Sequence, residues 1–199
     1  GKIYFIGGWN GTALNTTECF DPQANSWTSL TQMSHPRFGV ATATSGGKIY
    51  AIGGDGLSSV EIYDPILNTW SEGPELSVSV KWASAIERNR KIYLIGGTIG
   101  NQSTNQVFEL DTLSNTWMQK TSMQSARSAT KLVFFEGRIW SIGGYSNTHS
   151  ALVESYDPVT DTWATEPSLN IPRQWPMVWM TDDRIYIGGG ANGSSTKST

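Results

Sequence analysis

One short motif recurs along the whole sequence at a nearly constant interval. An Ile-aromatic-x-Ile run is followed by glycine pairs at residues 7–8, 53–54, 96–97 and 143–144, and a variant copy places its pair at 189–190. A tryptophan follows each of the first four copies, at Trp27, Trp70, Trp117 and Trp163. The interval from each Trp to the next glycine pair is constant, whereas the interval from a glycine pair to its Trp varies. Because insertions survive in exposed connections, we expect a tolerant surface loop directly after each glycine pair.

Each part of the motif predicts a part of an all-β unit. Both faces of the run at residues 48–52 are apolar, as in a strand buried between packed sheets. The glycine pair permits positive φ and a close backbone approach. Asp-Pro pairs at Asp21, Asp64 and Asp157 predict type I turns that close hairpins, and Asp111 stands at the same place without the proline. Each Trp offers about 150–250 Å² of surface to bury between neighbouring sheets.

We expect four strands in each unit and no helix. The innermost strand is expected to start near Arg37, Lys81, Arg127 or Arg173, and the second is the Ile-aromatic run. The third holds Tyr63 and its equivalents, and the outermost holds the Trp. Trp179, on the innermost strand of the last unit, is expected in the core.

The period and the motif together resemble the kelch family of β-propellers, over nearly the whole chain. The resemblance implies an all-β propeller of four-stranded antiparallel blades, with four Trp-bearing units and an incomplete fifth. The chain is then one domain or fragment, residues 1–199. Its repeat units are expected at about 1–36, 37–79, 80–126, 127–172 and, in part, 173–199.

The ends of the chain do not match a closed four-bladed ring. The first unit lacks an innermost strand, and the last has only its first two strands before the Ser/Thr-rich residues 194–199. Closing the ring would leave the runs at 3–8 and 185–190 competing for one place. Since kelch propellers commonly have six blades, we expect a piece of a larger ring of about six blades. Its open blade edges would be available for self-association.

Composition narrows the classes of partner. The formal net charge is −3 and no Lys/Arg cluster interrupts the chain, which disfavours nucleic acid as a partner. No apolar run is long enough to span a membrane. The single Cys19 cannot form a disulfide within the chain and slightly favours the cytoplasm. Asn-x-Ser/Thr tripeptides at Asn10, Asn15, Asn101 and Asn192 leave an extracellular location open.

The sequence contains no recognisable catalytic or metal-binding constellation. His35 and His149 are the only histidines, and no Cys-x-x-Cys or His-x-x-x-His spacing occurs, so we expect no metal site, cofactor or catalytic residue. Galactose oxidase is a kelch-type enzyme with a Cys-Tyr crosslink and two histidine ligands, and no motif here matches that histidine pair. The kelch sialic acid epimerases stay open, because their chemistry leaves no local motif. An enzymatic activity is thus not settled and is disfavoured.

An arginine recurs at one repeat position and has two interpretations. Arg37, Arg127 and Arg173 occupy this position, and Val80 replaces the arginine in one unit. A guanidinium with five donors can hold carbonyl groups where a strand begins, which is the favoured interpretation. The alternative is contact with a ligand.

The resemblance to kelch substrate adaptors also implies a ligand-binding mouth. In those adaptors, the residues after this arginine and after the glycine pair line the peptide-binding face. Carried over by position, the first set is Phe38, Gly39, Lys81, Trp82, Ser128, Ala129, Gln174 and Trp175. The second set is Trp9, Asp55, Thr98, Tyr145 and Ala191. Four of these aromatics, Trp9, Trp82, Tyr145 and Trp175, lie outside the core positions of the repeat, and they either bind a ligand or pack between blades.

The leading functional hypothesis is a non-enzymatic protein-interaction module. Its mouth would recognise a peptide or protein segment, as in an adaptor or scaffold. The alternative is a carbohydrate-binding or carbohydrate-converting propeller of the sialic acid epimerase or galactose oxidase type. A third reading, a purely structural propeller, would make the mouth aromatics packing residues. The fold alone does not decide among them.

Overall fold

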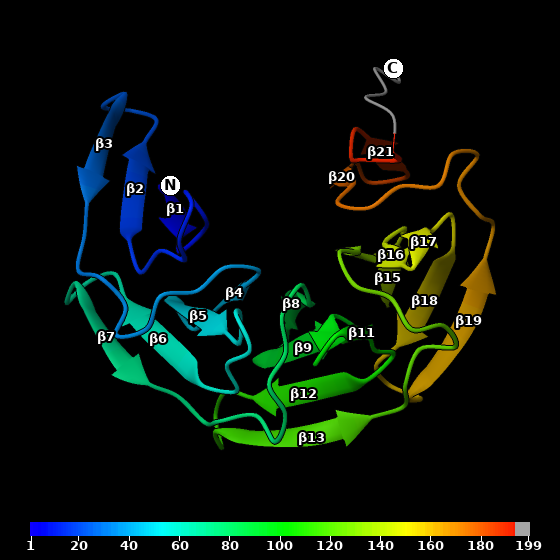
Figure 1. Ribbon diagram of the computed structural model, residues 1–199, viewed down its shortest axis with the longest axis horizontal. Helices are drawn as coiled ribbons and strands as arrows, with labels where there is room; N and C mark the ends of the chain where they lie inside the picture. Colours follow the sequence, from blue (N-terminus) through cyan, green and yellow to red (C-terminus); the bar gives the residue numbers. More distant parts are fainter. Residues whose placement is uncertain (194–199) are drawn as a thin grey trace.

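The computed structural model describes residues 1–193 as strands joined by turns and loops, and the expected end of the fifth unit, residues 194–199, lies outside the described residues. No helix occurs in residues 1–193, and the predicted all-β class is confirmed. The larger sheets lie side by side along an arc, with the Trp-bearing strands outermost (Figure 1). This is the arrangement of propeller blades.

Three sheets have the predicted four antiparallel strands, ordered from the centre outward. The second sheet consists of β4 (Ala41–Ser45), β5 (Lys48–Ile52), β6 (Val60–Asp64) and β7 (Thr69–Glu72). The third sheet consists of β8 (Ser84–Arg88), β9 (Lys91–Ile95), β12 (Val107–Asp111) and β13 (Thr116–Lys120). The fourth sheet consists of β14 (Lys131–Phe135), β15 (Arg138–Ile142), β18 (Val153–Asp157) and β19 (Thr162–Glu166).

The first and fifth sheets are incomplete within the described residues. The first sheet contains β1 (Ile3–Ile6), β2 (Thr17–Asp21) and β3 (Ser26–Ser29), and the fifth contains β20 (Met177–Met180) and β21 (Ile185–Gly188). They stand at the two ends of the arc with an opening between them (Figure 1). β1 and β21 each keep one edge that pairs with no strand in residues 1–193. Self-association through these edges stays a prediction.

The innermost strands begin later than predicted. β4 starts at Ala41 rather than near Arg37, and β8, β14 and β20 are displaced in the same direction. The physical reason is that the chain around Arg37 bonds to the preceding unit first. The Arg37 N–H donates to the Leu14 carbonyl (2.8 Å), and the Arg37 carbonyl accepts from the Gly8 N–H (2.9 Å). Only after these contacts does the chain turn into the sheet.

The core lies between neighbouring sheets. Ile52 and Val60 of the second sheet pack in one cluster with Ile92 and Leu94 of the third. Residues Ile49 to Ile52 of β5 are all buried, so both faces of this strand are covered, as the apolar run predicts. The first glycine of the pair allows the close approach of the next unit. A β-carbon on Gly53 would lie 2.4 Å from the Val80 carbonyl oxygen.

The repeated tryptophans join each sheet to the preceding connection. The indole N–H groups of Trp70, Trp117 and Trp163 donate to the carbonyls of Thr31 (2.9 Å), Pro74 (2.8 Å) and Thr121 (2.8 Å). A half-buried indole with a satisfied N–H holds its neighbour by both packing and hydrogen bonding. These three residues have the structural role that the repeat predicts.

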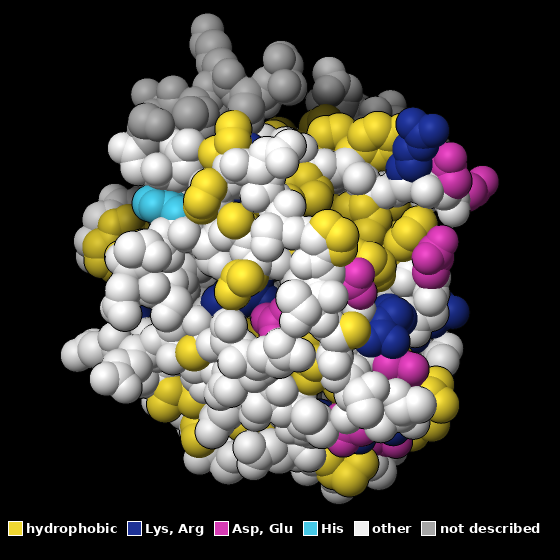
Figure 2. Space-filling model, turned by 90° about the vertical axis from the view of Figure 1, so that its right-hand side faces the viewer, with side chains coloured by type: hydrophobic (Ala, Val, Ile, Leu, Met, Phe, Trp, Pro, Cys, Tyr) yellow, Lys and Arg dark blue, Asp and Glu magenta, His cyan; other side chains and the backbone are white. Residues whose placement is uncertain are grey.

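The prediction that Trp179 belongs to the core is wrong. Its side chain is 54% exposed and stacks on Tyr186, with ring centroids 5.8 Å apart. The fifth sheet packs on the fourth through Val178, Ile185 and Ile187, but no sheet in the described residues packs on the face that carries Trp179, and Met177 and Met180 are also exposed. Figure 2 shows that hydrophobic side chains gather in the upper right of the face in view.

Candidate functional site

An open chain of three backbone hydrogen bonds joins four units around the centre of the molecule. Gly39, Trp82, Ala129 and Trp175 occupy the same repeat position, two residues beyond the arginine position. The N–H of Trp82 donates to the Gly39 carbonyl (2.8 Å), that of Ala129 to Trp82 (2.9 Å) and that of Trp175 to Ala129 (2.8 Å). We call these four residues the collar. All four have positive φ, at 61°, 58°, 55° and 48°.

Two short hairpins follow the glycine pairs of the third and fourth sheets and stand beside the collar. The first is β10 (Thr98–Ile99) with β11 (Gln102–Ser103), and the second is β16 (Tyr145–Ser146) with β17 (Thr148–His149). Antiparallel bridges join Lys81 to Thr98 and Ser128 to Tyr145, and the same bridge joins Gln174 to Ala191. The structure thus brings together the two sets of residues that the sequence predicted for the mouth.

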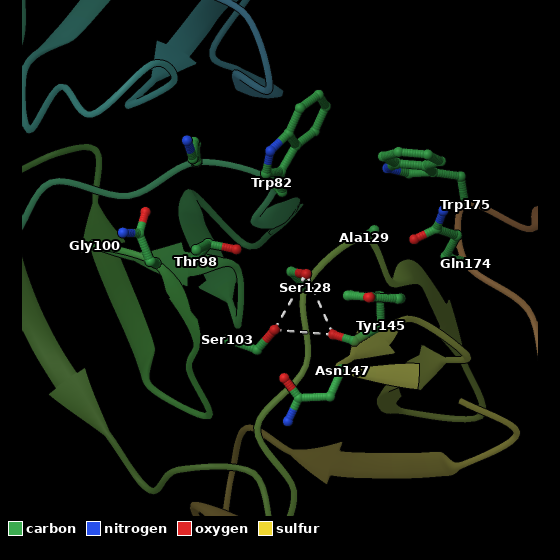
Figure 3. A pocket seen from close by; sticks show the side chains of 12 residues that line it. Trp82, Thr98, Gly100, Ser103, Ser128, Ala129, Tyr145, Asn147, Gln174 and Trp175 are labelled. Atoms are coloured by element: carbon green, nitrogen blue, oxygen red, sulfur yellow. Dashed lines mark hydrogen bonds between the residues drawn. The ribbon is translucent and has the colours of Figure 1, made fainter. Parts of the chain in front are cut away.

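A cavity of about 380 Å³ opens between these hairpins and the collar (Figure 3). Of the predicted residues, those that line it are Lys81, Trp82, Thr98, Ser128, Ala129, Tyr145, Gln174 and Trp175. The sequence-based prediction missed Gly100, Asn101, Ser103 and Asn147, which also line it. The sequence did contain a feature that pointed to these four residues. The loops after Gly97 and Gly144, in which they lie, are longer than the loop after Gly54.

The serine residues on the floor of the cavity are engaged within the protein. Ser128 is buried, and its hydroxyl lies 3.2 Å from the Tyr145 carbonyl. The Ser103 hydroxyl donates to the same carbonyl at 3.0 Å (Figure 3). The two serines therefore hold the hairpin of Tyr145 in place.

Trp9, Phe38 and Asp55 were predicted at the mouth but lie outside the cavity. Trp9 and Phe38 nevertheless continue its aromatic lining. Ring centroids are 5.1 Å apart for Trp9 and Phe38, 5.5 Å for Phe38 and Trp82, and 5.4 Å for Trp82 and Trp175. We call these four residues the aromatic row. Asp55 is exposed, and only its backbone N–H bonds to this region, at the Phe38 carbonyl (2.9 Å).

The repeated arginines do not belong to the ligand-binding surface. Arg37, Arg127 and Arg173 are 0%, 1% and 8% exposed. Their Nη1 groups donate to the carbonyls of Gly53 (2.6 Å), Gly143 (2.7 Å) and Gly189 (2.7 Å), each the first glycine of the pair in the same unit. Their inclusion among the ligand contacts is wrong, because the guanidinium groups are enclosed. The interpretation that they hold backbone carbonyls is confirmed.

Buried carboxylates on the third strands complete these arginine sites. Glu61 accepts from Arg37 and from the Ser34 N–H (2.7 Å). Burial raises the pKa of Glu61, but the hydrogen bonds from Ser34 and Arg37 outweigh it and leave the pKa below its usual value. Glu154 pairs with Arg127 in the same way. Where Val80 replaces the arginine, Glu109 pairs with Lys91 instead.

The cavity offers unused hydrogen-bond donors. Within residues 1–193, the indole N–H groups of Trp82 and Trp175 donate to no protein acceptor, unlike those of Trp70, Trp117 and Trp163. Lys81 forms no ion pair there, and its ammonium lies 5.6 Å from the centroid of the Phe38 ring. No Asp, Glu or His side chain is among the described residues that line the cavity. The free indole and ammonium donors therefore match acceptors on a ligand, while the amide oxygens of Asn101, Asn147 and Gln174 in the lining can also accept.

The histidines lie apart from the cavity and from one another. The backbone N–H of His35 donates to Glu61 (3.2 Å), and the His149 ring packs on Tyr145 with centroids 5.6 Å apart. In residues 1–193, no three His, Cys, Asp or Glu side chains come together as metal ligands would. The described part of the chain also has no helix able to cross a membrane.

Comparison with known proteins relates the whole arc to one family. The Kelch motif model matches residues 1–34, 36–77, 83–124 and 126–170. Kelch repeat and BTB domain-containing protein 1 of cowpox virus (strain Brighton Red) is 27% identical over 99% of this chain and 29% of its own length. Kelch-like protein 26 of Danio rerio is 26% identical over 96% of this chain and 26% of its own length. The chain thus spans less than a third of either relative.

A solved structure has the same fold. The structure of YjhT matches with a TM-score of 0.86, covering 98% of this chain and 76% of that chain. The sequence identity is 17%, so the similarity concerns the fold alone.

Proposed function

The chain belongs to the kelch-repeat family of β-propellers, and we propose that it is a protein-interaction module that binds a peptide segment of a partner at the mouth cavity. The BTB and kelch domains named in its relatives support a role in protein assemblies. The cavity, with the aromatic row beside it, would be the recognition surface, as in an adaptor or scaffold.

The observation that carries the proposal is the presence of two tryptophans at collar positions. A left-handed backbone costs a residue with a β-carbon roughly 1–2 kcal/mol, so glycine is favoured there. Gly39 and Ala129 show that small residues satisfy the collar in the alternate units. Trp82 and Trp175 accept this cost and still leave their indole N–H groups unused, and Trp175 stays 51% exposed. Strained residues of this kind concentrate at functional sites.

The same surface favours a peptide over a carbohydrate. Sugar hydroxyls donate as well as accept, and a sugar site therefore needs acceptors for them. The acceptors in the described lining of the cavity are neutral amide and hydroxyl oxygens, such as those of Asn101, Asn147 and Gln174, and no carboxylate is among them. Peptide carbonyls are acceptors only, which suits the unused N–H groups. Aromatic side chains with a few donors are also typical of the centres of protein interfaces.

Selection of peptides from a random display library on the full chain tests the proposal. Selected peptides should bind at least about tenfold more weakly to the Trp175→Ala and Trp82→Ala variants, as expected for central interface residues. Trp27→Ala is the matched control, because Trp27 has a similar exposure (56%) on the outer strand of the first sheet. Binding that is equal in all variants, or found only on a glycan array, would overturn the proposal.

A further inference from the structure

The aromatic row and the collar together specify a class of peptide. We propose that the preferred ligand of the mouth is a proline-rich segment in the polyproline II conformation, an inference that rests on the proposed function. Three features of the structure carry it: the tilt of the rings, the occupied carbonyl groups and the donors that stay unused.

The rings of the aromatic row form a corrugated strip across four units. Successive interplanar angles are 59° for Trp9 and Phe38, 68° for Phe38 and Trp82, and 59° for Trp82 and Trp175. A flat sugar ring stacks best on a single open face, whereas this strip alternates ring faces and ring edges. Aromatic-lined grooves are the usual surface for polyproline II segments, whose pyrrolidine rings fit between such ridges.

Most backbone acceptors of the mouth are already occupied, and among the collar carbonyls only that of Trp175 accepts no hydrogen bond in residues 1–193. The collar carbonyls of Gly39, Trp82 and Ala129 each accept a hydrogen bond from the next collar residue. The carbonyls one position earlier accept in the same way, Lys81 from Thr98 (2.7 Å) and Gln174 from Ala191 (2.9 Å). A ligand strand therefore finds no continuous free backbone edge here, which disfavours recognition by β-strand addition at this surface.

The donors that remain match the hydrogen-bonding groups of proline. Each ordinary residue of a peptide brings one N–H that needs an acceptor, and three of the four collar carbonyls are already engaged. Proline has no N–H, and a polyproline II segment turns its carbonyls outward because it makes no internal hydrogen bonds. The indole N–H groups of Trp82 and Trp175 and the Lys81 ammonium can donate to those carbonyls. The ligand is also preformed, which lowers the entropic cost of binding.

Fluorescence anisotropy with two labelled peptides tests the inference on the full chain. One peptide contains about ten prolines, and the other is a Gly-Ser peptide of the same length. We expect saturable binding of the proline peptide alone. Trp82→Ala and Trp175→Ala should weaken it at least about tenfold. Trp175→Phe, which keeps a ring but removes the N–H, should weaken it about threefold to tenfold. Trp27→Ala should leave it unchanged.

The outcomes separate this inference from the proposed function. If the display library yields Trp175-dependent peptides without enriched proline, and the proline peptide does not bind, the inference is wrong and the proposed function stands. If neither the library nor the proline peptide binds, both are wrong. If the Trp175→Ala variant binds the proline peptide as tightly as the parent protein does, the peptide binds outside the mouth, and the inference is wrong. Thermal melts of each variant verify that it is folded.

Discussion

The indole ring of Trp82 lies against the backbone of Gly39 in the preceding unit. A β-carbon on Gly39 would come within 2.8 Å of Trp82 Cδ2, and the Trp82 N–H donates to the Gly39 carbonyl at 2.8 Å. The position of a ring in one unit therefore depends on the size of the collar residue in the unit before it. Trp82 contacts both Phe38 and Trp175. The contact between Gly39 and Trp82 therefore also determines how the rings of the aromatic row are positioned.

Gly39→Ala should therefore damage both stability and binding. The new methyl group clashes with the Trp82 ring, and φ is +61°, so we expect a loss of about 2–3 kcal/mol in the free energy of unfolding. Displacement of the ring should weaken peptide binding at least about tenfold. Gly56→Ala is the control, because Gly56 has φ of +78° and no atom within 4 Å of the added methyl. Gly56→Ala should lower the free energy of unfolding by about 1 kcal/mol and leave peptide binding unchanged. Equal effects of the two variants would contradict the contact between ring and backbone.

Trp175→Gly should separate stability from binding. Glycine relieves the left-handed backbone at φ of +48°, which offsets the loss of a ring that is 51% exposed. The thermal midpoint should then stay within about 4 °C of the parent protein, while peptide binding is lost. Differential scanning calorimetry and anisotropy on the same preparations provide the two measurements. A large drop in the midpoint with unchanged binding would show that Trp175 is a packing residue.

Arg127→Met should be among the most destabilising single changes. It leaves Glu154, which is 2% exposed, without its ion-pair partner, and it frees the carbonyls of Gly143 and Leu152. Removing one member of a buried pair typically costs about 3–5 kcal/mol. Urea unfolding should show this loss, and the double variant Arg127→Met/Glu154→Leu should recover part of it. Lys131→Met, which removes an exposed cation, serves as the control. If the single and double variants unfold alike, the pair does not stabilise the protein as we infer.

Two of the repeated tryptophans, one with a hydrogen-bonded indole N–H and one without, should respond differently to Trp→Phe exchange. Trp117→Phe removes the hydrogen bond to the Pro74 carbonyl and should cost about 1–2 kcal/mol in the free energy of unfolding. In residues 1–193 the Trp27 N–H has no acceptor, so Trp27→Phe should cost less than about 0.5 kcal/mol. Equilibrium denaturation of both variants checks the difference, and equal costs would refute a role for the hydrogen bond between units.

Stability should fall on acidification because several carboxyl groups titrate at lower pH in the folded state. Hydrogen bonds from the Leu67 and Ile66 N–H groups lower the pKa of Asp64, and the same turn geometry lowers the pKa of Asp21, Asp111 and Asp157. The pKa of Glu61 is lowered as well. A depressed folded pKa stabilises the protein above the unfolded pKa, and this contribution is lost as the pH falls through the folded pKa.

The free energy of unfolding should therefore decrease progressively below about pH 5. Urea titrations across this range measure the slope, which Asp64→Asn should reduce. Asp55→Asn removes a charge whose carboxylate accepts no hydrogen bond among the described residues, and it should leave the slope as it is. A slope that is the same in all three proteins would rule out the turn carboxylates as its source.

Much of the fold follows from local patterns that the sequence displays directly. The Ile-aromatic run at residues 48–52 is apolar on both faces, and β5 is buried on both faces. Asp64 precedes a proline, and its carboxylate binds the backbone of the turn as the turn type requires. The repeat also placed Lys81, Trp82 and Trp175 at the mouth, because a residue keeps its place in a blade when the register is constant.

Only the tertiary structure decided which of these positions face a ligand. Arg37 and Trp82 are two residues apart in the repeat register, yet the first is fully buried and the second lines the cavity. Trp179 has the apolar side chain of a core residue but is exposed, because no neighbouring sheet in the described residues packs on its face. A repeat determines the conformation of each unit from its own residues. Burial, the aromatic row and the cavity depend on neighbouring units, through contacts between residues far apart in the sequence.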